Sequence, residues 1–347
     1  MAQLRQKLGR KFLLPLCFGL SAVDVAGLEP YAMTEIPASL RVEGTVVGGI
    51  SGLSASSDRL FLLSDDRGKM GDSRFYEVTF EIRSRKIVLG HWSVHPFKKI
   101  PLIQGRSAPL DPEGFARLPN GDLLVSSEAD TNLKPRAQNR VMIFDAKGVW
   151  KNDVVLPQEI QPELTGRQFR GTSNNFGPEG LSLTPAADSF WLALERPLVQ
   201  EKQDRLIRLD RFAVWAFSHD LTRGYQLDLP ESGQGEIFRG VSSVLALSTT
   251  KLLVLERSAR IEGAGIGYGG AIYRTDCEKD PCVKTKIFDL MTGLKGLRGG
   301  KNIPNFEGLS WGPAVVEGRR TVLLVSDNNF SEKTGSEIIA FLVKDAP

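Results

Sequence analysis

The chain is poor in histidine, with three histidines among 347 residues. Residues 308–312 satisfy the Gly-x-Ser-x-Gly pattern of a hydrolase nucleophile, but no histidine follows Ser310 to act as its base. We therefore interpret Ser310 as an ordinary residue of an inner strand. His91 and His95 have no recognisable partner in the sequence, and we expect both to be structural.

Cysteine is equally scarce, and only Cys277 and Cys282 lie beyond the first 27 residues. A metal site at this pair would need two further soft ligands nearby, and the histidines are far away in the sequence. The two cysteines flank a short polar loop, which a local bridge would brace in an oxidising compartment. We predict a Cys277–Cys282 disulfide.

The chain also lacks an excess of charge once its first residues are set aside. Its net charge of +3 equals the charge of residues 1–27, which carry four basic residues and one acid, Asp24. The remainder is neutral, and nothing in it favours nucleic-acid binding.

Residues 1–27 have the pattern of a secretory signal. A basic segment ends at Lys11, an apolar run covers residues 12–20, and small residues follow at 25–27. The apolar run is short and is broken by Pro15, so we expect no stable membrane span. Lipidation at Cys17 is less favoured, because Leu16 is bulky where such a site requires a small residue. We expect export to the periplasm or the medium, with residues 28–347 forming one mature domain.

No long helical pattern is present, whereas the 35 glycines and 19 prolines suit an all-β chain with many turns. One unit recurs five times: an apolar stretch, a turn, a second apolar stretch, then a carboxylate. Its equivalent positions, 51, 113, 179, 242 and 307, are 62, 66, 63 and 65 residues apart. A period of this size built from strand-like halves predicts a ring or array of β-units.

Each of these repeats has room for four strands, but the last reaches the end of the chain after three. We predict that residues 40–47 supply the missing strand and close a β-propeller of five blades. A propeller of six blades is the alternative, if residues 157–176 or 205–220 contain an irregular blade.

The repeat places acids at one face of such a ring, because a first strand starts where the antiparallel second strand ends. Ser51 and Ser242 replace the first-strand glutamate in two repeats. One interpretation is structural: Glu-Gly marks turns, and the acids pair with the arginines that follow them. The other is that crowded carboxylates bind Ca²⁺, which accepts about six to eight oxygen ligands. The first-strand acids are Glu113, Glu179 and Glu307, and the second-strand acids are Asp65, Asp66, Glu128, Asp130, Glu195, Glu256 and Asp327.

From these acids we select candidate metal ligands and catalytic groups. Glu179 would act in catalysis together with Arg196 and Arg257, two of the arginines that directly follow second-strand acids. The glycine-rich residues 263–270 lack the Lys-Ser/Thr ending of a phosphate loop, so we predict a flexible surface loop beside the channel. The candidate Ca²⁺ ligands are Asp66, Glu113, Glu179, Glu195, Glu307 and Asp327.

Residues 175–181 (Asn-Phe-Gly-Pro-Glu-Gly-Leu), 191–198, 253–257, 305–309 and 325–329 resemble the phytase-like family, often labelled "esterase-like activity of phytase". That family is similar to calcium-dependent β-propeller phytases. The resemblance implies an exported propeller that hydrolyses small phosphorylated or anionic substrates at a Ca²⁺-lined mouth. The alternative is a non-catalytic propeller that binds a ligand, a glycan or a protein. In either case we expect a monomer.

Overall fold

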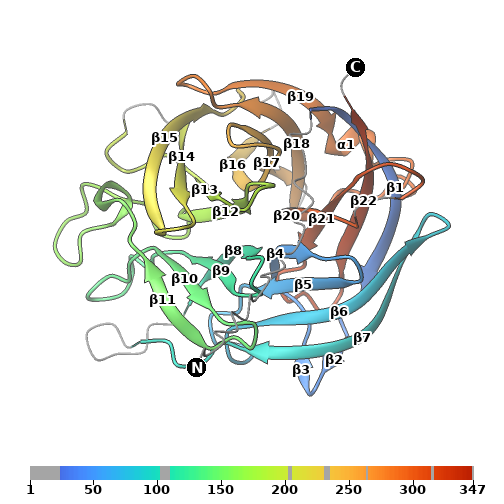
Figure 1. The fold of residues 1–347 in the computed structure, drawn as a ribbon, viewed down its shortest axis with the longest axis horizontal. Coiled ribbons are helices and arrows are strands. Elements are labelled where there is room, and N and C mark those ends of the chain that lie inside the picture. The colour runs from blue at the N-terminus through green and yellow to red at the C-terminus, as the bar shows by residue number, and fades with distance from the viewer. Residues whose placement is uncertain are drawn as a thin grey trace, which may run out of the picture.

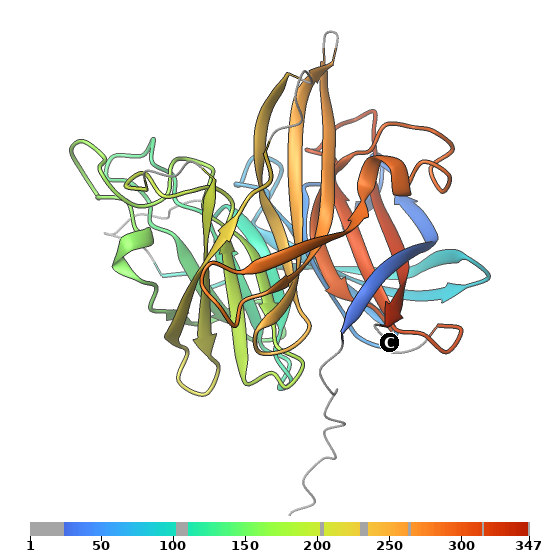
Figure 2. The same ribbon diagram turned by 90° about the horizontal axis from the view of Figure 1, so that it is seen from above.

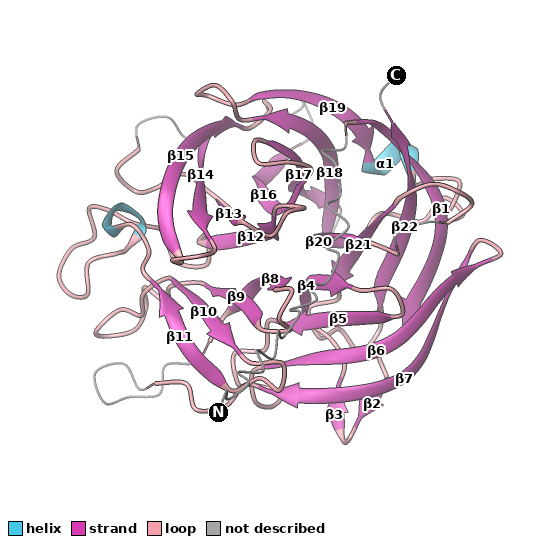
Figure 3. Cartoon of the chain, in the orientation of Figure 1, coloured by secondary structure: helices cyan, strands magenta, loops and turns pink. Residues whose placement is uncertain are grey.

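The computed structural model describes residues 24–101, 110–201, 205–229, 235–262, 265–313 and 316–345. Strands arranged around a centre form most of it (Figures 1 and 3). The described helical segments are the helix α1 (Leu290–Gly293) and the 3-10 turn η1 (Gln158–Ile160). None of the described helices is long and apolar enough to cross a membrane. The fold is therefore all-β, as the sequence predicts.

Three sheets each contain four strands that follow one another in the chain. We call them the second, third and fourth units. The second unit comprises β8 (Pro112–Arg117), β9 (Leu123–Ser127), β10 (Arg140–Phe144) and β11 (Trp150–Val154). The third comprises β12 (Pro178–Leu183), β13 (Ser189–Leu194), β14 (Leu206–Ala213) and β15 (Ser218–Gln226). The fourth comprises β16 (Glu236–Ala246), β17 (Lys251–Glu262), β18 (Gly265–Asp276) and β19 (Val283–Asp289).

The largest sheet has eight strands and divides into two further units of four. They meet where β1 and β7 pair at a single position, Met33 with Lys86. The first unit comprises β4 (Ile50–Ala55), β5 (Arg59–Ser64), β6 (Arg74–Arg83) and β7 (Lys86–Pro96). The fifth comprises β20 (Asn305–Trp311), β21 (Thr321–Asp327), β22 (Ser336–Asp345) and β1 (Val25–Ile36).

The N-terminal segment supplies the strand beside β22, but not from the predicted residues. β1 pairs antiparallel with β22 from Val25 to Ile36, so the prediction of residues 40–47 is wrong. Those residues instead form a small hairpin of β2 (Arg41–Val42) and β3 (Thr45–Val46). Glu43 and Gly44 have positive φ between these strands, which turns the chain too sharply for one continuous strand. β1 also begins inside the predicted leader, whose earlier residues lie outside the described part.

The first strands of the five units lie innermost, and each contacts the next. β4 lies beside β8, β8 beside β12, β12 beside β16, β16 beside β20, and β20 beside β4. Five apolar clusters fill the spaces between neighbouring units. In the described parts of residues 157–176 and 205–220, we find η1, β14 and part of β15, and no additional four-stranded sheet.

Each innermost strand contains a β-bulge at the repeat position. The register shifts at Ser51, Glu113, Glu179, Ser242 and Glu307. The Glu-Gly pair is therefore a strand feature, and its interpretation as a turn is wrong. A bulge changes the direction in which its side chain points. The glycine that follows has no side chain, which lets the innermost strand of the next unit approach closely. A Cβ on Gly114 would lie 2.8 Å from the Glu179 carbonyl oxygen.

The structure settles two further predictions in the fourth unit. Cys277 and Cys282 form a disulfide between β18 and β19, which confirms that prediction. The glycine-rich segment is not a loop over residues 265–270, because these residues form the start of β18 and pair with β17. Glycine suits this strand, since a Cβ on Gly269 would lie 2.7 Å from the Ser258 hydroxyl.

Candidate functional site

A pocket of about 380 Å³ lies where the innermost strands meet, and carboxylates from four of the five units surround it. The predicted Glu113, Glu179 and Glu307 reach it from the bulges of β8, β12 and β20. Asp327 reaches it from the end of β21 and Glu195 from the residue after β13. The bulges and the antiparallel pairing thus bring together five of the six predicted metal ligands.

Two sets of three carboxylates lie close enough to share a cation. One oxygen each from Asp111, Glu113 and Glu128 lies within 4.8 Å of the others, and the same holds for Glu128, Glu179 and Glu195. Glu128 belongs to both sets. Its Oε1 accepts a hydrogen bond from the Gly177 amide, but its Oε2 is buried and has no hydrogen-bond partner among the described residues.

Two arginines join neighbouring units beside these acids. Arg257 on β17 pairs with Glu195 of the third unit and Glu307 of the fifth, and it donates to Asn305 Oδ1 at 2.9 Å. Arg67 pairs with Asp111 of the second unit at 2.6 Å. The structural interpretation therefore holds for Arg67 and Arg257.

The acids nevertheless outnumber the arginines. The pocket and the two sets of carboxylates contain eight acids and two arginines. Three acids pair with those arginines, and within the described chain the other five have no basic partner within salt-bridge distance. The five are Asp65, Glu113, Glu128, Glu179 and Asp327.

Crowding and burial disfavour the charged form of these carboxylates. Burial, followed by the charges of Asp327 and Glu307, raises the pKa of Asp65 to about 9. Burial likewise raises the pKa of Glu307 to about 8 and that of Asp327 to about 6. The pKa values of Glu113, Glu128 and Glu179 lie well above the usual range, because each is buried beside other carboxylates. A bound cation would relieve this repulsion.

The structure places two predicted site residues elsewhere. Asp66 pairs with the buried Arg74 at 2.7 Å and accepts hydrogen bonds from the amides of Lys69 and Met70, so it lies apart from the acidic cluster. The Arg196 guanidinium stacks on Phe176 and Phe238 and donates to the Arg239 carbonyl oxygen at 3.2 Å. Arg196 thus supports two aromatic walls of the pocket without lining it.

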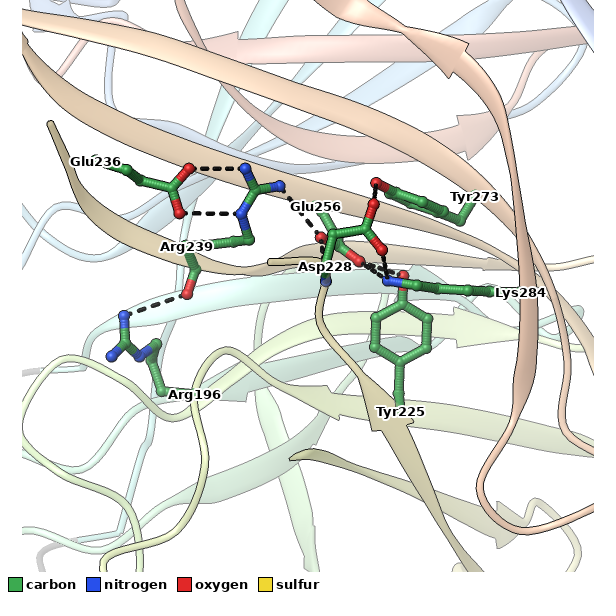
Figure 4. A network of polar contacts seen from close by, with 8 residues as sticks. All are labelled: Arg196, Tyr225, Asp228, Glu236, Arg239, Glu256, Tyr273 and Lys284. Carbon is green, nitrogen blue, oxygen red and sulfur yellow. Dashed lines mark hydrogen bonds and ion pairs between the residues drawn. The ribbon is translucent and has the colours of Figure 1, made fainter. Parts of the chain in front are cut away.

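Glu256, the corresponding acid of the fourth unit, is neutralised in a separate network (Figure 4). Its carboxylate accepts from Tyr225 at 2.8 Å and pairs with Lys284 and Arg239. Lys284 lies over the Tyr273 ring and also pairs with Asp228 at 2.8 Å. The same repeat position therefore carries a structural ion pair in one unit and an unpaired acid in another.

The sequence-based list of metal ligands omitted three acids of this site. Asp65 directly precedes the candidate ligand Asp66, and Glu128 occupies the second-strand acid position of its repeat. Asp111 carries a positional signal in the sequence, because it stands two residues before Glu113, as Asn305 stands two residues before Glu307. In both units this residue contacts a pocket arginine.

The family described as esterase-like activity of phytase matches residues 45–330, a range that includes the eight acids of the site. The chain belongs to the phytase-like family. No curated protein sequence matches this phytase-like protein.

The solved structures that match this phytase-like protein share little sequence with it. The Dos1 propeller has 8% identity and a TM-score of 0.34, over 84% of this chain and 68% of that one. The RS223-Beta-xylosidase has 12% identity and a TM-score of 0.44, over 87% and 96%. The alpha-L-arabinofuranosidase PaAbf62A from Podospora anserina has 10% identity and a TM-score of 0.44, over 91% and 98%. We draw no functional conclusion from similarities of this size.

The raised pKa values predict how the stability of the metal-free protein depends on pH. Asp65 and Glu307 have folded-state pKa values of about 9 and about 8, against ordinary values of 3.8 and 4.5. The stability that these two carboxyl groups contribute is complete below their ordinary pKa values. It is lost as the pH rises through their raised folded-state pKa values. With a chelator present, we expect the melting temperature to fall by at least about 5 °C between about pH 5 and pH 9.

The Glu307→Gln variant is the control for this measurement, because it removes one of the titrating groups. Its melting temperature should decrease less over the same pH range. A melting temperature that rises with pH in the chelated unsubstituted protein would contradict the prediction.

Proposed function

We propose that this phytase-like protein hydrolyses phosphate esters at the acidic pocket with Ca²⁺ bound there. The observation that carries the proposal is the group of five carboxylates that have no basic partner among the described residues, at the centre of a chain of this family. Ca²⁺ suits them because it prefers oxygen ligands and tolerates irregular geometry.

The residues fit such an ion on two counts. The Glu128 Oε2 atom is buried and accepts no hydrogen bond from any described residue, an arrangement that costs free energy unless a partner is present. In addition, both sets of three close carboxylates consist of hard oxygen donors only. We assign Glu113, Glu128, Glu179 and Glu195 as the residues that hold the cation, with Glu307 and Asp327 beside them.

The finer architecture belongs to the same proposal. We infer that the five units are blades of a closed propeller. The unbroken series of contacts among β4, β8, β12, β16 and β20 supports this, as does the pairing of β1 with β22. A closed ring explains why acids from separate units share one pocket.

In the reaction, the oxygen of a water molecule forms a bond to phosphorus, and the bond from phosphorus to the ester oxygen breaks. When bound, Ca²⁺ supplies positive charge that offsets the charge of the phosphate oxygens. Glu179 accepts a proton from the attacking water, and the departing alkoxide takes up a proton from solvent water, so the products are an alcohol and inorganic phosphate. Arg257 and Arg67 carry the pocket's positive charge and face the anionic substrate.

We further propose that the protein acts outside the cytoplasm as a monomer. The disulfide supports export, because such bonds persist in oxidising compartments. The substrate is a small anionic molecule, consistent with a pocket of about 380 Å³.

Metal removal and phosphate release test this function together. We expect the purified protein to release phosphate from a simple phosphomonoester when Ca²⁺ is present, and to lose this activity on chelation and regain it on adding Ca²⁺ back. The melting temperature should rise with Ca²⁺ in parallel. If Ca²⁺ changes neither quantity, the hydrolase proposal fails and the non-catalytic propeller takes its place. The pairs that Arg257 and Arg67 make between units favour that alternative.

A further inference from the structure

One wall of the acidic pocket is apolar and belongs to a hairpin that extends past the other strands. Figure 2 shows β17 and β18 rising above the rest of the molecule on one side. Their register pairs Arg257 with Gly270, Ala259 with Tyr268 and Ile261 with Ile266. Because alternate residues share a face of a strand, these pairs form one face that leads outward from the acids.

That face is directed at the pocket. Ala259, Tyr268 and Ile266 line the same pocket as the carboxylates, together with Ile237 and Phe238 of β16. Ile237 lies at a bulge of β16, where the register shifts between Glu236 and Phe238. The apolar wall and the acidic cluster are therefore parts of one continuous cavity.

The isoleucines of this wall are unusually exposed. The exposed fractions are 55% for Ile237, 66% for Ile261 and 57% for Ile266, so no described part of the chain covers them. The opposite face of the hairpin carries polar residues, including Arg260, whose Nε donates a hydrogen bond to Glu262 Oε1 at 2.8 Å. A hairpin that only extended into water would not need an apolar face toward the pocket, and contiguous exposed apolar groups mark binding sites.

The charges of the pocket limit how much anion it can bind. Its two arginines, Arg67 and Arg257, are already engaged with Asp111, Glu195 and Glu307. Five further carboxylates repel anions until a cation binds. In a ligand with many phosphates, each phosphate group would be repelled by these carboxylates. A ligand with a single phosphate requires only the cation site.

We propose that the substrate is an amphiphilic phosphate monoester, whose single phosphate binds at the acidic cluster and whose apolar alcohol part packs against Ile237, Ile266, Phe238 and Tyr268. The inference rests on the proposed function for the position of the phosphate. It adds the class of the alcohol: aryl or alkyl, in place of a polyhydroxylated or polyphosphorylated one.

Binding measurements test this directly, without relying on turnover. In the Ca²⁺-loaded full-length protein, we expect 1-naphthyl phosphate, followed by its fluorescence, to bind at least about 10-fold more tightly than glycerol 2-phosphate or inositol hexakisphosphate, followed by calorimetry. The double variant Ile237→Ser/Ile266→Ser should lose most of this preference. Val283→Ser is the matched control, because Val283 is 63% exposed on β19 and does not line the pocket.

Phosphate release from the same compounds separates this inference from the proposed function. Absence of hydrolysis for all three contradicts the hydrolase, while the binding preference still decides the inference. Equal affinities, or a preference that survives in the double variant, overturn it. A protein that sediments as a dimer, and becomes monomeric only in the double variant, also overturns it, because a second copy would then cover the isoleucines.

Discussion

Replacing Glu179 with glutamine should stabilise the metal-free protein and abolish most of its stabilisation by Ca²⁺. Glu179 is buried beside Glu128 and Glu195, and its pKa lies well above the usual range. At about pH 8 the Glu179 carboxyl destabilises the folded state in either form, because the charged form is buried beside other carboxylates and the neutral form must first take up a proton. A neutral amide of the same shape avoids both costs. We expect a gain of at least about 1 kcal/mol without metal and at least about 10-fold weaker Ca²⁺ binding.

Glu256→Gln is the matched control, because Glu256 is a buried glutamate of the repeat, as Glu179 is, but lies outside the acidic cluster. Its carboxylate is paired with Lys284 and Arg239, so the variant removes one of the two acids that each of these cations contacts. That loss should destabilise the protein by about 1–3 kcal/mol and leave the Ca²⁺ response intact. Urea unfolding and calorimetric titration measure both quantities. Destabilisation by both variants would show that the acidic cluster is purely structural.

Removing β1 should prevent stable folding. The strand buries Val25, Leu28, Tyr31 and Ile36, and burying four such side chains contributes about 6–12 kcal/mol. A whole domain is stable by only about 5–15 kcal/mol. Without β1, the outer edge of β22 would also lose its hydrogen-bonded neighbour.

The experiment compares a chain that starts at Asp24 with one that starts at Pro37. We expect a cooperative melting transition for the longer chain and none for the shorter one. Adding a synthetic peptide of residues 24–36 should restore the transition, because β1 is the outermost strand of the fifth unit and pairs with β22 along its length. Identical melting of the two chains would show that β1 is dispensable.

Much of the arrangement was predictable, because it depends on local patterns. The apolar pairs of strands recur at intervals of 62 to 66 residues, and each recurrence became a four-stranded unit. The N-terminal strand was harder to place. Residues 40–47 include Val42, Thr45, Val46 and Val47, which favour a strand, whereas residues 25–36 contain Gly27 and Pro30. Only the pairing with β22 shows that the second of these segments is the strand. Pairing of segments distant in the sequence depends on which apolar face the rest of the fold leaves uncovered.

The sequence by itself determined that this protein is all-β and is built from a repeat that carries acids at equivalent positions. Both features follow from the period and the residue types, which are local properties. Tertiary structure decided which of those acids remain unpaired. Glu256 and Asp66 pair with Lys284 and Arg74, whereas Glu113, Glu128 and Glu179 have no basic partner in the part of the chain that the structure describes. The physical reason is that the environment of a carboxylate depends on side chains brought to it from other units, and a few ångströms separate an ion pair from a cation site.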